Sequence, residues 1–470
     1  MYKTPLDCVK SYCVGMETCG AEFDEENQIF VSESSKIQHK RMNRKIGNVS
    51  CTTFNILAPI YKRINSEICR ESQFRERWWN RNKGILDMLL KKESSVICLQ
   101  EFWVGNEELV EMYERDLKNK GYAIYKLGRP KNRGDGLLTA VKKDRFRVVK
   151  VKKLLLNDNG DRVAQLLHVQ SVLPFRRSQN GIIQQDTLVV NTHLMFPHNS
   201  DICLVRLRQV YKILERLEAY KVECKLPSVP IILCGDWNGS KRGHVYKFLR
   251  SQGFVSSYDA AHHYTDSDAD AHKWVSHRNH RGNICGVDFI WLLNPNNYRK
   301  SLKTSWNEAV FGIVKSKLWE AGLKDRDAFC HFKSENSSVD YVKFSETLDQ
   351  LVRGLSTEEI EDLWAAVDTN RNGIADYEEF QRVLNPTEQS AAPVFSRQSA
   401  TQHLVGIDRK LQDVENLQES AFGFDVKKAF LFPPEVERGM WPDNYVLSDH
   451  APLTVEFAPV RLPRTHESVC

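Results

Sequence analysis

The sequence predicts an α/β domain with sizeable sheets that is interrupted, near its C-terminal end, by an all-helical unit. Strand-like apolar runs alternate with single amphipathic helices from about residue 46 to about residue 300. The pattern then becomes helical until about residue 385, and strand character returns in NYVLSDHAPLTVEFAPV, residues 444–460. A helical unit bracketed by strands of one domain indicates an insertion, which loop sites tolerate at small entropic cost.

Length and composition place few limits on function. The chain has 470 residues, of which 41% are hydrophobic and 27% charged, as is ordinary for a globular protein of two or three domains. The net charge of +5, from 66 basic and 61 acidic residues, is too small to argue for nucleic-acid binding.

The sequence shows no targeting signal that we recognise. We expect no secretory signal, organelle transit peptide or membrane-spanning run. The 12 cysteines show no paired metal-binding spacing and several lie in strand-like apolar runs. We therefore expect a reducing compartment, which is the cytoplasm or the nucleus.

The pattern divides the chain into six parts. Residues 1–45 are polar, and residues 387–420 contain a stretch that bears Ser, Gln and Pro. Both have the weak periodicity of flexible segments. The predicted boundaries are a flexible N-terminal arm at 1–45, the α/β domain in two parts at 46–310 and 421–460, a helical pair at 315–386, a linker at 387–420 and a tail at 461–470.

Within the α/β part, each element is predicted from its periodicity. Apolar Phe74, Trp78, Ile85, Leu86 and Leu89 recur at helical spacing. The expected strands or strand-rich stretches are 49–58, 95–102, 135–156, 162–174, 186–194, 229–238 and 286–293. The expected helices are 71–92, 106–122 with a stop at Gly121, 203–220 and 245–254.

Polar side chains repeatedly stand where these apolar strands end. Taken alone, each of these residues could have a purely structural role. Examples are a histidine in the core, or a turn in which Asp and Asn side chains hydrogen-bond their own backbone. An acid that closes a run such as VICLQE is costly to bury unpaired, so it needs a metal or a donor. Because strand ends converge on one sheet edge, we expect a common cleft lined by Asn55, Glu101, His193, Asp236, Asn238, Asp288, Asp449 and His450.

Residues 368–379, DTNRNGIADYEE, match the calcium-binding EF-hand loop in full. The expected Ca²⁺ ligands are Asp368, Asn370, Asn372, the carbonyl of Ile374, Asp376 and a bidentate Glu379, with the sharp turn at Gly373. The helix that precedes the loop carries a capping box, Ser356 with Glu359. Only three side-chain carboxylates serve the ion, which favours weak rather than tight binding.

A second copy of this unit is degenerate. VDYVKFSETL at 339–348 echoes ADYEEFQRVL at 375–384, but Lys343 stands where the bidentate Glu would be. We expect the first copy to complete an EF-hand pair without holding an ion, and so one Ca²⁺ per chain.

The ordered motifs FNILA, LQE, Asp135–Gly136, NTHL, GDWN, VDFI and SDHAPL resemble the endonuclease/exonuclease/phosphatase superfamily, over about residues 47–300 and 420–460. The similarity is greatest to the carbon-catabolite-repressor-type deadenylase, nocturnin and angel branch. The resemblance implies a four-layer α/β (α+β) sandwich, with two mixed β-sheets flanked by helices and here an inserted all-α EF-hand pair. The whole chain is also similar to plant proteins described as calcium-binding that combine such a core with an EF-hand.

The resemblance also implies roles for the polar residues. Glu101 would be the principal ligand of Mg²⁺, with Mn²⁺ as the alternative ion, and Asn55 would support it. Asp236 would deprotonate the attacking water and Asn238 would hold that water or a phosphate oxygen. His193 and His450 would donate to the phosphate, Asp288 would orient His450, and Asp449 would bind a second metal or act structurally.

The basic stretch 272–283, HKWVSHRNHRGN, has two interpretations. Trp274, His277, Arg278, His280 and Arg281 could bind substrate phosphates and stack a base. Alternatively, the stretch is a solvated basic loop.

Three functions compete at this point. The first is a Mg²⁺-dependent 3′ exonuclease on single-stranded RNA, such as a poly(A) tail. The second uses the same site on a small phosphorylated molecule, a dinucleotide phosphate or an inositol phosphate. The third is a calcium-responsive binding protein with a vestigial nuclease fold, against which the intact polar set argues. A further hypothesis is that calcium modulates activity, because the EF-hand unit lies between the strands of Asp288 and His450. Alternatively, the unit is a docking or stability module.

Overall fold

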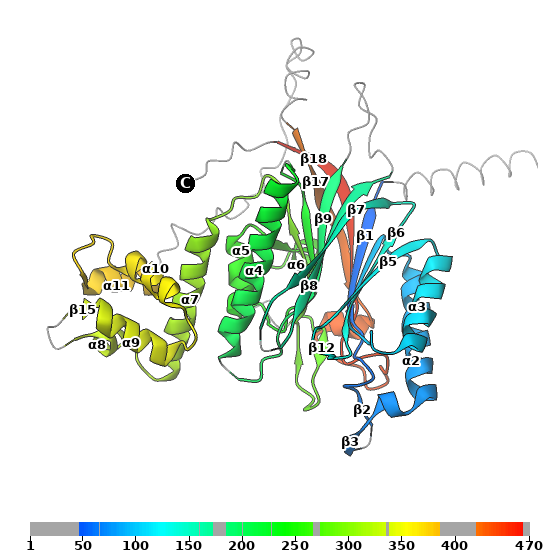
Figure 1. Ribbon diagram of the computed structural model, residues 1–470, viewed down its shortest axis with the longest axis horizontal. Coiled ribbons are helices and arrows are strands. Elements are labelled where there is room, and N and C mark those ends of the chain that lie inside the picture. The colour runs from blue at the N-terminus through cyan, green and yellow to red at the C-terminus, as the bar shows by residue number, and fades with distance from the viewer. Residues whose placement is uncertain are drawn as a thin grey trace, which may run out of the picture. The chain divides into compact units, whose positions relative to one another are not determined.

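The computed structural model describes residues 47–463, apart from 65, 159, 173–184, 200, 227, 267–272, 335–337 and 386–419. The predicted arm at 1–45, nearly all of the predicted linker and most of the predicted tail lie outside these residues. Figure 1 shows the arrangement of the described elements.

Two six-stranded mixed sheets form the centre of the α/β domain. In the first, β1 and β4 run parallel and the other neighbours antiparallel, in the order β17 (Ser420–Leu431), β18 (Leu453–Pro463), β1 (Val49–Asn55), β4 (Val96–Phe102), β6 (Gly136–Lys142) and β5 (Tyr122–Gly128). In the second, β9 and β10 are the parallel pair, in the order β11 (Val255–Ser256), β14 (Asp288–Leu293), β10 (Ile231–Asp236), β9 (Asp186–His193), β8 (Val163–Ser171) and β7 (Phe146–Leu155).

The first sheet buries one face under helices and the other against the second sheet. Its outer face meets α2 (Arg75–Lys92) and α3 (Glu107–Asn119), whose apolar stripes pack on Ile97 and Leu99 of β4. The alternate residue Cys98 belongs to the core between the sheets. Cys51 Sγ of β1 lies 3.4 Å from Cys234 Sγ of β10, so the sheets are in direct contact.

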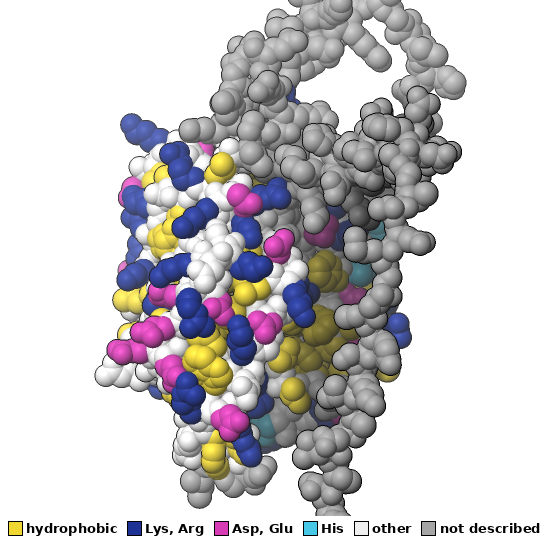
Figure 2. Space-filling view, turned by 90° about the vertical axis from the view of Figure 1, so that its right-hand side faces the viewer, with side chains coloured by type: hydrophobic (Ala, Val, Ile, Leu, Met, Phe, Trp, Pro, Cys, Tyr) yellow, Lys and Arg dark blue, Asp and Glu magenta, His cyan; other side chains and the backbone are white. Residues whose placement is uncertain are grey.

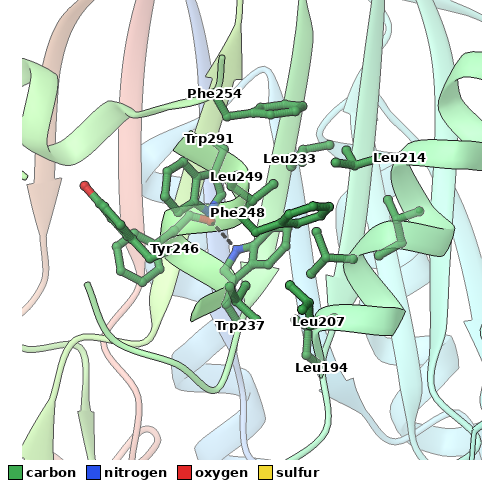
Figure 3. Close-up of a cluster of buried hydrophobic side chains, with 14 of the residues drawn as sticks. Leu194, Leu207, Leu214, Leu233, Trp237, Tyr246, Phe248, Leu249, Phe254 and Trp291 are labelled. Carbon is green, nitrogen blue, oxygen red and sulfur yellow. Dashed lines mark hydrogen bonds between the residues drawn. The ribbon is translucent and has the colours of Figure 1, made fainter. Parts of the chain in front are cut away.

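The second sheet is covered by α4 (Ile202–Glu223) and α5 (His244–Ser251), as Figures 1 and 3 show. Leu207 of α4 and Phe248 of α5 reach the sheet beside Trp237, whose indole N–H donates to the Phe289 carbonyl at 3.3 Å. Burying such aromatic and leucine side chains stabilises the layer by about 1.5–3 kcal/mol each. The predicted helices on both sides of two mixed sheets are thus confirmed.

Smaller elements connect these layers. They are β2 (Arg63–Ile64), β3 (Ser66–Arg70), the 3₁₀ helix η1 (Glu71–Gln73), α6 (Ser257–His262), the hairpin β12 (His277–Arg278) and β13 (Ile284–Cys285), and the 3₁₀ helix η4 (Pro434–Arg438).

A helical segment follows β14. It comprises α7 (Leu302–Glu320), α8 (Arg326–Phe332), α9 (Tyr341–Leu351), α10 (Thr357–Val367) and α11 (Tyr377–Leu384), drawn in green to yellow in Figure 1. Strands β15 (Val339–Asp340) and β16 (Ile374–Ala375) pair antiparallel, with Val339 opposite Ala375. The two similar stretches of sequence therefore face each other. Phe332, Phe344 and Phe380 form an aromatic core between them.

The boundary that we predicted between residues 310 and 315 falls inside α7. This helix is continuous and packs on α4 and α5 as well as on α9, α10 and α11. Trp306 meets Tyr211 of α4 edge to face, and Arg208 of α4 forms an ion pair with Glu359 of α10 at 2.6 Å. The helical segment is therefore docked on the second sheet's helices through α7.

The strand-rich stretch 135–156 forms two strands, β6 and β7, joined by a turn at Lys143–Arg145, as predicted. Predictions near the C-terminal end were less precise. Strand β17 was missed, and β18 starts at Leu453 and ends at Pro463, later than the predicted 444–460. In the described segments, we find no helix with the length and apolarity that a bilayer crossing requires.

The face formed by α2 and α3 carries interspersed charges of both signs, which Figure 2 shows. Arg75 pairs with Glu108, and Lys83 lies 2.9 Å from Asp116. This surface matches the balanced composition, and ion pairs at the surface contribute little to stability because water and salt screen them.

Candidate active site

The register of the central strands brings the polar strand ends together. On the parallel pairs, Asn55 of β1 lies opposite Gln100 of β4, and Asp236 of β10 lies opposite His193 of β9. On its other side Asp236 faces Asp288 of β14. Polar ends of both sheets therefore meet at one edge of the sandwich.

Asp236 lies at the centre of this group. Its Oδ2 accepts a hydrogen bond from Asn55 Nδ2 at 3.0 Å and lies 3.3 Å from His193 Nε2 and 3.6 Å from His450 Nε2. Its Oδ1 accepts from the Asn238 N–H at 2.9 Å. Burial raises the pKa of Asp236, which makes the carboxylate a stronger base than an exposed one.

Asn55 connects the carboxylates. Its Nδ2 donates to Glu101 Oε1 at 3.3 Å as well as to Asp236, and it lies 3.4 Å from His450 Nε2. Its Oδ1 accepts from the Leu57 N–H at 3.1 Å, which fixes the orientation of the amide. One side chain thus sets the spacing of three of the predicted site residues.

A β-bulge turns Glu101 into the cleft. The register of β4 against β6 shifts between Leu99 and Phe102, and Glu101 has a φ of +53°. The Ala58 N–H donates to its Oε2 at 3.1 Å. Burial, followed by the charges of Asp449 and Asp135, raises the pKa of Glu101 to about 7. A half-buried carboxylate held near two other acids is a suitable ligand for a divalent cation.

His450 and Asp288 form a buried pair. His450 Nδ1 lies 2.9 Å from Asp288 Oδ2, which also accepts from Ser276 Oγ at 2.7 Å. Burial alone would lower the pKa of His450, but the Asp288 and Asp236 carboxylates outweigh it and raise this pKa to about 10. The ring is therefore an imidazolium at neutral pH and donates from both nitrogens.

His277 covers the other face of His450. The two rings stack with their centroids 4.3 Å apart, and the backbones pair as an isolated bridge. Burial, followed by the charge of His450, lowers the pKa of His277 to about 4. Asp449 Oδ2 lies 3.9 Å from His277 Nε2, at the more open side of the cleft.

His193 is held between an amide and an arginine. Asn238 Nδ2 lies 3.1 Å from its Nε2 and donates to the Leu194 carbonyl at 3.0 Å. Arg162 Nη1 lies 3.1 Å from its Nδ1. Burial and then the charge of Arg162 lower the pKa of His193 well below its ordinary value, so the ring is neutral.

Arg162 was not predicted, because it belongs to none of the motifs. It stands directly before β8, and the pairing of Ala164 with Thr192 is what brings it beside His193. A positively charged residue just before a strand that neighbours NTHL is the only sequence signal, and it is weak.

Asp135 and Gly136 supply a supporting network. Asp135 accepts hydrogen bonds from Tyr61 Oη at 2.7 Å and from Arg129 Nη1 at 2.9 Å. A Cβ atom on Gly136 would lie 2.3 Å from the Leu127 carbonyl oxygen, so only glycine fits there. Tyr61 and Arg129 are further residues of the cleft that the motifs did not reveal.

A polar contact between the sheets lies directly below the site. Gln100 Nε2 donates to Asn191 Oδ1 at 2.8 Å, and Asn191 Nδ2 donates to the Leu138 carbonyl at 3.2 Å. Gln100 directly precedes Glu101, and Asn191 stands two residues before His193. A satisfied buried network of this kind fixes the relative position of the two sheets.

The basic stretch is a hairpin beside the site, and one of its predicted roles is wrong. Trp274 is 2% exposed and packs on Tyr258 and Phe289, so it has no free face for a base. Arg278 Nη1 donates to Asp443 at 3.0 Å. His280 and Arg281 are exposed at the tip between β12 and β13.

The loop between α10 and α11 directs its polar side chains inward. Glu379 is 5% exposed, and its Oε1 accepts from the Thr369 N–H at 3.2 Å. Asp368 accepts from the N–H of Asn372 and of Gly373. Asn370, Asn372 and Asp376 also accept from backbone N–H groups of the same loop. The oxygen-rich loop has the hard donors that Ca²⁺ favours.

One backbone hydrogen bond of this loop recurs in the described part of the companion stretch. Asp340 accepts from the Lys343 N–H at 2.9 Å, just as Asp376 accepts from the Glu379 N–H at 2.8 Å. Lys343 therefore takes the place of Glu379 and brings an ammonium group where the other loop has a carboxylate.

Comparison with known proteins identifies the family that the sequence of this chain resembles. A model described as the endonuclease/exonuclease/phosphatase family matches residues 53–364. An Arabidopsis thaliana protein named as an uncharacterised calcium-binding protein is 56% identical over 424 residues, which are 88% of this chain and 85% of that protein.

More distant relatives match over shorter stretches. Carbon catabolite repressor protein 4 homolog 6 of Arabidopsis thaliana is 27% identical over 182 residues, which are 36% of this chain and only 22% of that protein. A solved structure of ANGEL2, described as a 2′,3′-cyclic phosphatase, is 18% identical with a TM-score of 0.41 and covers 53% of this chain and 84% of that chain. The human nocturnin catalytic domain gives a TM-score of 0.39 at 20% identity, covering 53% of this chain and 83% of that chain.

Proposed function

Because this chain belongs to the endonuclease/exonuclease/phosphatase family and so is a phosphoester hydrolase, we propose that it is a Mg²⁺-dependent 3′ exonuclease on single-stranded RNA. The observation that carries the proposal is the position of Asp236, whose Oδ2 lies within 3.0–3.6 Å of Asn55, His193 and His450. A base flanked by two imidazole donors suits in-line attack of water on a phosphodiester, because the base can take the proton of the water and the donors can stabilise the charge on the phosphate.

Each residue has a task in this reaction. Asp236 accepts the proton of the attacking water, which its raised pKa favours. Neutral His193 and charged His450 donate to the phosphoryl oxygens, where negative charge develops. Asp288 keeps His450 charged and oriented through the 2.9 Å hydrogen bond. Asn55 holds the base and Glu101 in fixed relation.

Glu101 would hold the metal ion, with Asp449 as a second oxygen donor at the open side. The raised pKa of Glu101 reflects burial and a neighbouring acid, which a divalent cation would relieve. When bound, Mg²⁺, or Mn²⁺ in its place, polarises the phosphate and neutralises its charge.

The hairpin β12–β13 favours the hypothesis that the substrate is a polymer. Its base is joined to the site through the His277–His450 bridge, and its tip presents His280 and Arg281 to solvent. Cationic side chains that extend beyond the scissile position suit the further phosphates of a strand. A small phosphorylated molecule, such as a dinucleotide phosphate or an inositol phosphate, is the alternative substrate class.

Turnover of the purified full-length chain on a panel tests the proposal. The panel is poly(A) RNA, mixed RNA, single-stranded DNA, NADP and inositol phosphates, each with Mg²⁺, with Mn²⁺ and with EDTA. Glu101→Gln and Asp236→Asn are the inactivated variants, and Asp186→Asn, which lies outside the site, is the matched acid control.

The outcomes separate the hypotheses. Stepwise shortening of RNA from a free 3′ end, blocked by a 3′ phosphate and lost in both inactivated variants, supports the proposal. Phosphate release from a small molecule with RNA untouched moves the assignment to the second substrate class. Binding of RNA without turnover in any condition would leave a vestigial fold.

We further propose that the α10–α11 loop is a functional EF-hand that binds one Ca²⁺, and that the ion modulates activity. Two contacts connect the helical segment to the α/β domain. Arg208 of α4 forms an ion pair with Glu359 of α10, and α7 packs on α4 and α5 as well as on α9, α10 and α11. A ligand shifts activity only if it favours one arrangement of these elements. Equal turnover with calcium and with EGTA, and in Glu379→Gln, would reject the modulation but not the binding.

A further inference from the structure

The hydrogen bond between Arg162 and His193 has a chemical consequence. A guanidinium has only N–H donors and does not lose its proton in a protein. Arg162 Nη1 lies 3.1 Å from His193 Nδ1, so Nδ1 must be the lone-pair acceptor. The ring then carries its proton on Nε2.

We propose that Arg162 is a positioning residue that locks His193 as the neutral Nε2–H tautomer, the form that donates into the cleft. Within the described part of the chain, this is the hydrogen bond that the Arg162 side chain makes, and its Nε is buried without a partner. The inference builds on the donor role given to His193 in the proposed function.

The surroundings of His193 favour the same form. Asp236 Oδ2, at 3.3 Å from Nε2, is a ready acceptor for that proton when no substrate is present. Burial and four nearby cationic or imidazole groups disfavour a second proton on the ring; these groups are Arg162, His450, Arg129 and His277.

Asn238 competes with this assignment. Its Nδ2 lies 3.1 Å from His193 Nε2, and a donated N–H there would favour the opposite tautomer. Arg162 should prevail because a charge-assisted hydrogen bond is roughly twice as strong as a neutral one. The amide can also direct its donor to the Leu194 carbonyl at 3.0 Å, whereas the guanidinium has no other acceptor in the described contacts.

The arrangement explains why a cation is useful beside a catalytic imidazole. A carboxylate at Nδ1 would raise the pKa, as Asp288 does for His450. An arginine instead keeps the ring neutral and still fixes its orientation. The site would then hold one charged and one neutral donor, each set by its partner at Nδ1.

The test is nitrogen NMR of ring-labelled histidines in the substrate-free, metal-free chain. The His193 signal is assigned by its loss in His193→Gln. In the unmodified chain we expect a protonated Nε2 and an unprotonated Nδ1 around neutral pH. A protonated Nδ1, or two protonated nitrogens, would overturn the proposal without the need for any Arg162 variant.

Variants of Arg162 supply a second measurement. Arg162→Met should shift population to the Nδ1–H form, which Asn238 then favours, and lower kcat by about 10- to 100-fold with a smaller change in KM. Arg162→Lys keeps a donor and should restore both. Arg129→Met removes a neighbouring charge but not the hydrogen bond, and should leave the tautomer unchanged.

The two claims fail independently. If the panel shows no RNA turnover but the tautomer follows Arg162 as expected, the proposed substrate is wrong and the positioning role stands. If RNA is cleaved and Arg162→Met leaves the tautomer unchanged, the positioning role is wrong and the function stands.

Discussion

His450 Nδ1 lies 2.9 Å from Asp288 Oδ2, although the two residues are 162 positions apart in the sequence. The carboxylates of Asp288 and Asp236 raise the pKa of His450 to about 10 against the opposing effect of burial. The pair therefore keeps a positive donor at the candidate site throughout the neutral range.

Asp288→Asn should move the alkaline limb of the pH–rate profile downward. Removal of an opposite charge in contact lowers a pKa by about one to three units, so His450 should lose its proton nearer neutrality. We expect kcat at pH 8 to fall by about 10- to 100-fold. The measurement is kcat between pH 5 and 10 on the substrate identified by the panel.

A matched control exists outside the site. His168 Nε2 lies 2.8 Å from Asp186 Oδ1, and this pair does not contact the predicted site residues in the described structure. Asp186→Asn should leave both limbs of the profile in place. An equal shift in both variants would mean that the limb reports general stability and not His450.

The same pair affects stability with a defined sign. Because folding raises the pKa of His450 above its ordinary value of 6.5, the stabilisation is complete below about pH 6.5 and is lost as the pH rises through about 10. Asp288→Asn should therefore reduce the denaturation midpoint most at acidic and neutral pH. A difference between the two chains that grows above pH 10 would contradict the pairing.

Glu101 should make metal affinity depend on pH. Its pKa is raised to about 7, first by burial and then by Asp449 and Asp135, and the ion competes with the proton for the carboxylate. Mn²⁺ affinity should rise about tenfold per pH unit up to pH 7 and level off above it. Calorimetric titration of the metal-free chain at pH 6, 7 and 8 measures this.

Two variants sharpen the metal test. Glu101→Gln should weaken binding and remove its pH dependence, whereas the exposed Glu107→Gln should change neither. Asp449→Asn removes a charge that raises the pKa of Glu101, so the level region should begin at lower pH. Unaltered affinity in Glu101→Gln would show that the ion binds elsewhere.

Periodicity predicted an α/β domain with sizeable sheets, and the family resemblance implied the layers of the fold. The apolar run of VICLQEF predicted a buried strand, and in the structure Ile97 faces the outer helices and Cys98 the core between the sheets. Strand β17 was missed because its apolar residues do not alternate through SAFGFDVKKAFL, where a bulge lies between Val426 and Lys428. The predicted domain boundary falls inside α7 because the sequence pattern does not show that one helix packs on both the α/β domain and the helical segment.

Site residues were predicted where the signal lies within one strand, and were missed where it depends on the pairing of strands. Strand-end carboxylates such as Glu101 and Asp236 were predicted from their own strands, and the structure brings them together through Asn55. The bulge that turns Glu101 inward and the contact of Arg162 with His193 depend on strand register. The pairing register depends on both strands and on the turns that join them, so the sequence of one strand does not determine it.

Trp274 was misinterpreted because burial, not composition, decides whether an aromatic ring is available. With 2% exposure, it should behave as a core residue. Trp274→Ala should lower the free energy of unfolding by about 3–5 kcal/mol, measured by denaturant titration. Trp274→Phe should cost less and leave KM for RNA unchanged.

The exposed tip of the β12–β13 hairpin should affect substrate binding and not the free energy of unfolding. Arg281→Ala should leave the free energy of unfolding within about 0.5 kcal/mol of the parent. It should raise KM for an RNA strand, more at low than at high salt, because phosphate contacts are screened by counterions. If the effect on KM does not depend on salt, Arg281 does not contact substrate phosphates and the tip is a solvated basic loop.

The α10–α11 loop should bind one calcium ion per chain, through Glu379. The buried carboxylate of Glu379 already closes the loop by accepting from Thr369 and Asn370 backbone N–H groups, and Lys343 replaces its counterpart in the companion loop. Calorimetry with Ca²⁺ should give a stoichiometry of one, and calcium at 100 times its Kd should stabilise the folded chain by about 2.7 kcal/mol. Glu379→Gln should abolish both effects, while the neighbouring exposed Glu378→Gln should preserve them. Binding of two ions, or undiminished binding in Glu379→Gln, would contradict this assignment, since the ammonium of Lys343 leaves the companion loop without the carboxylate that a second ion needs.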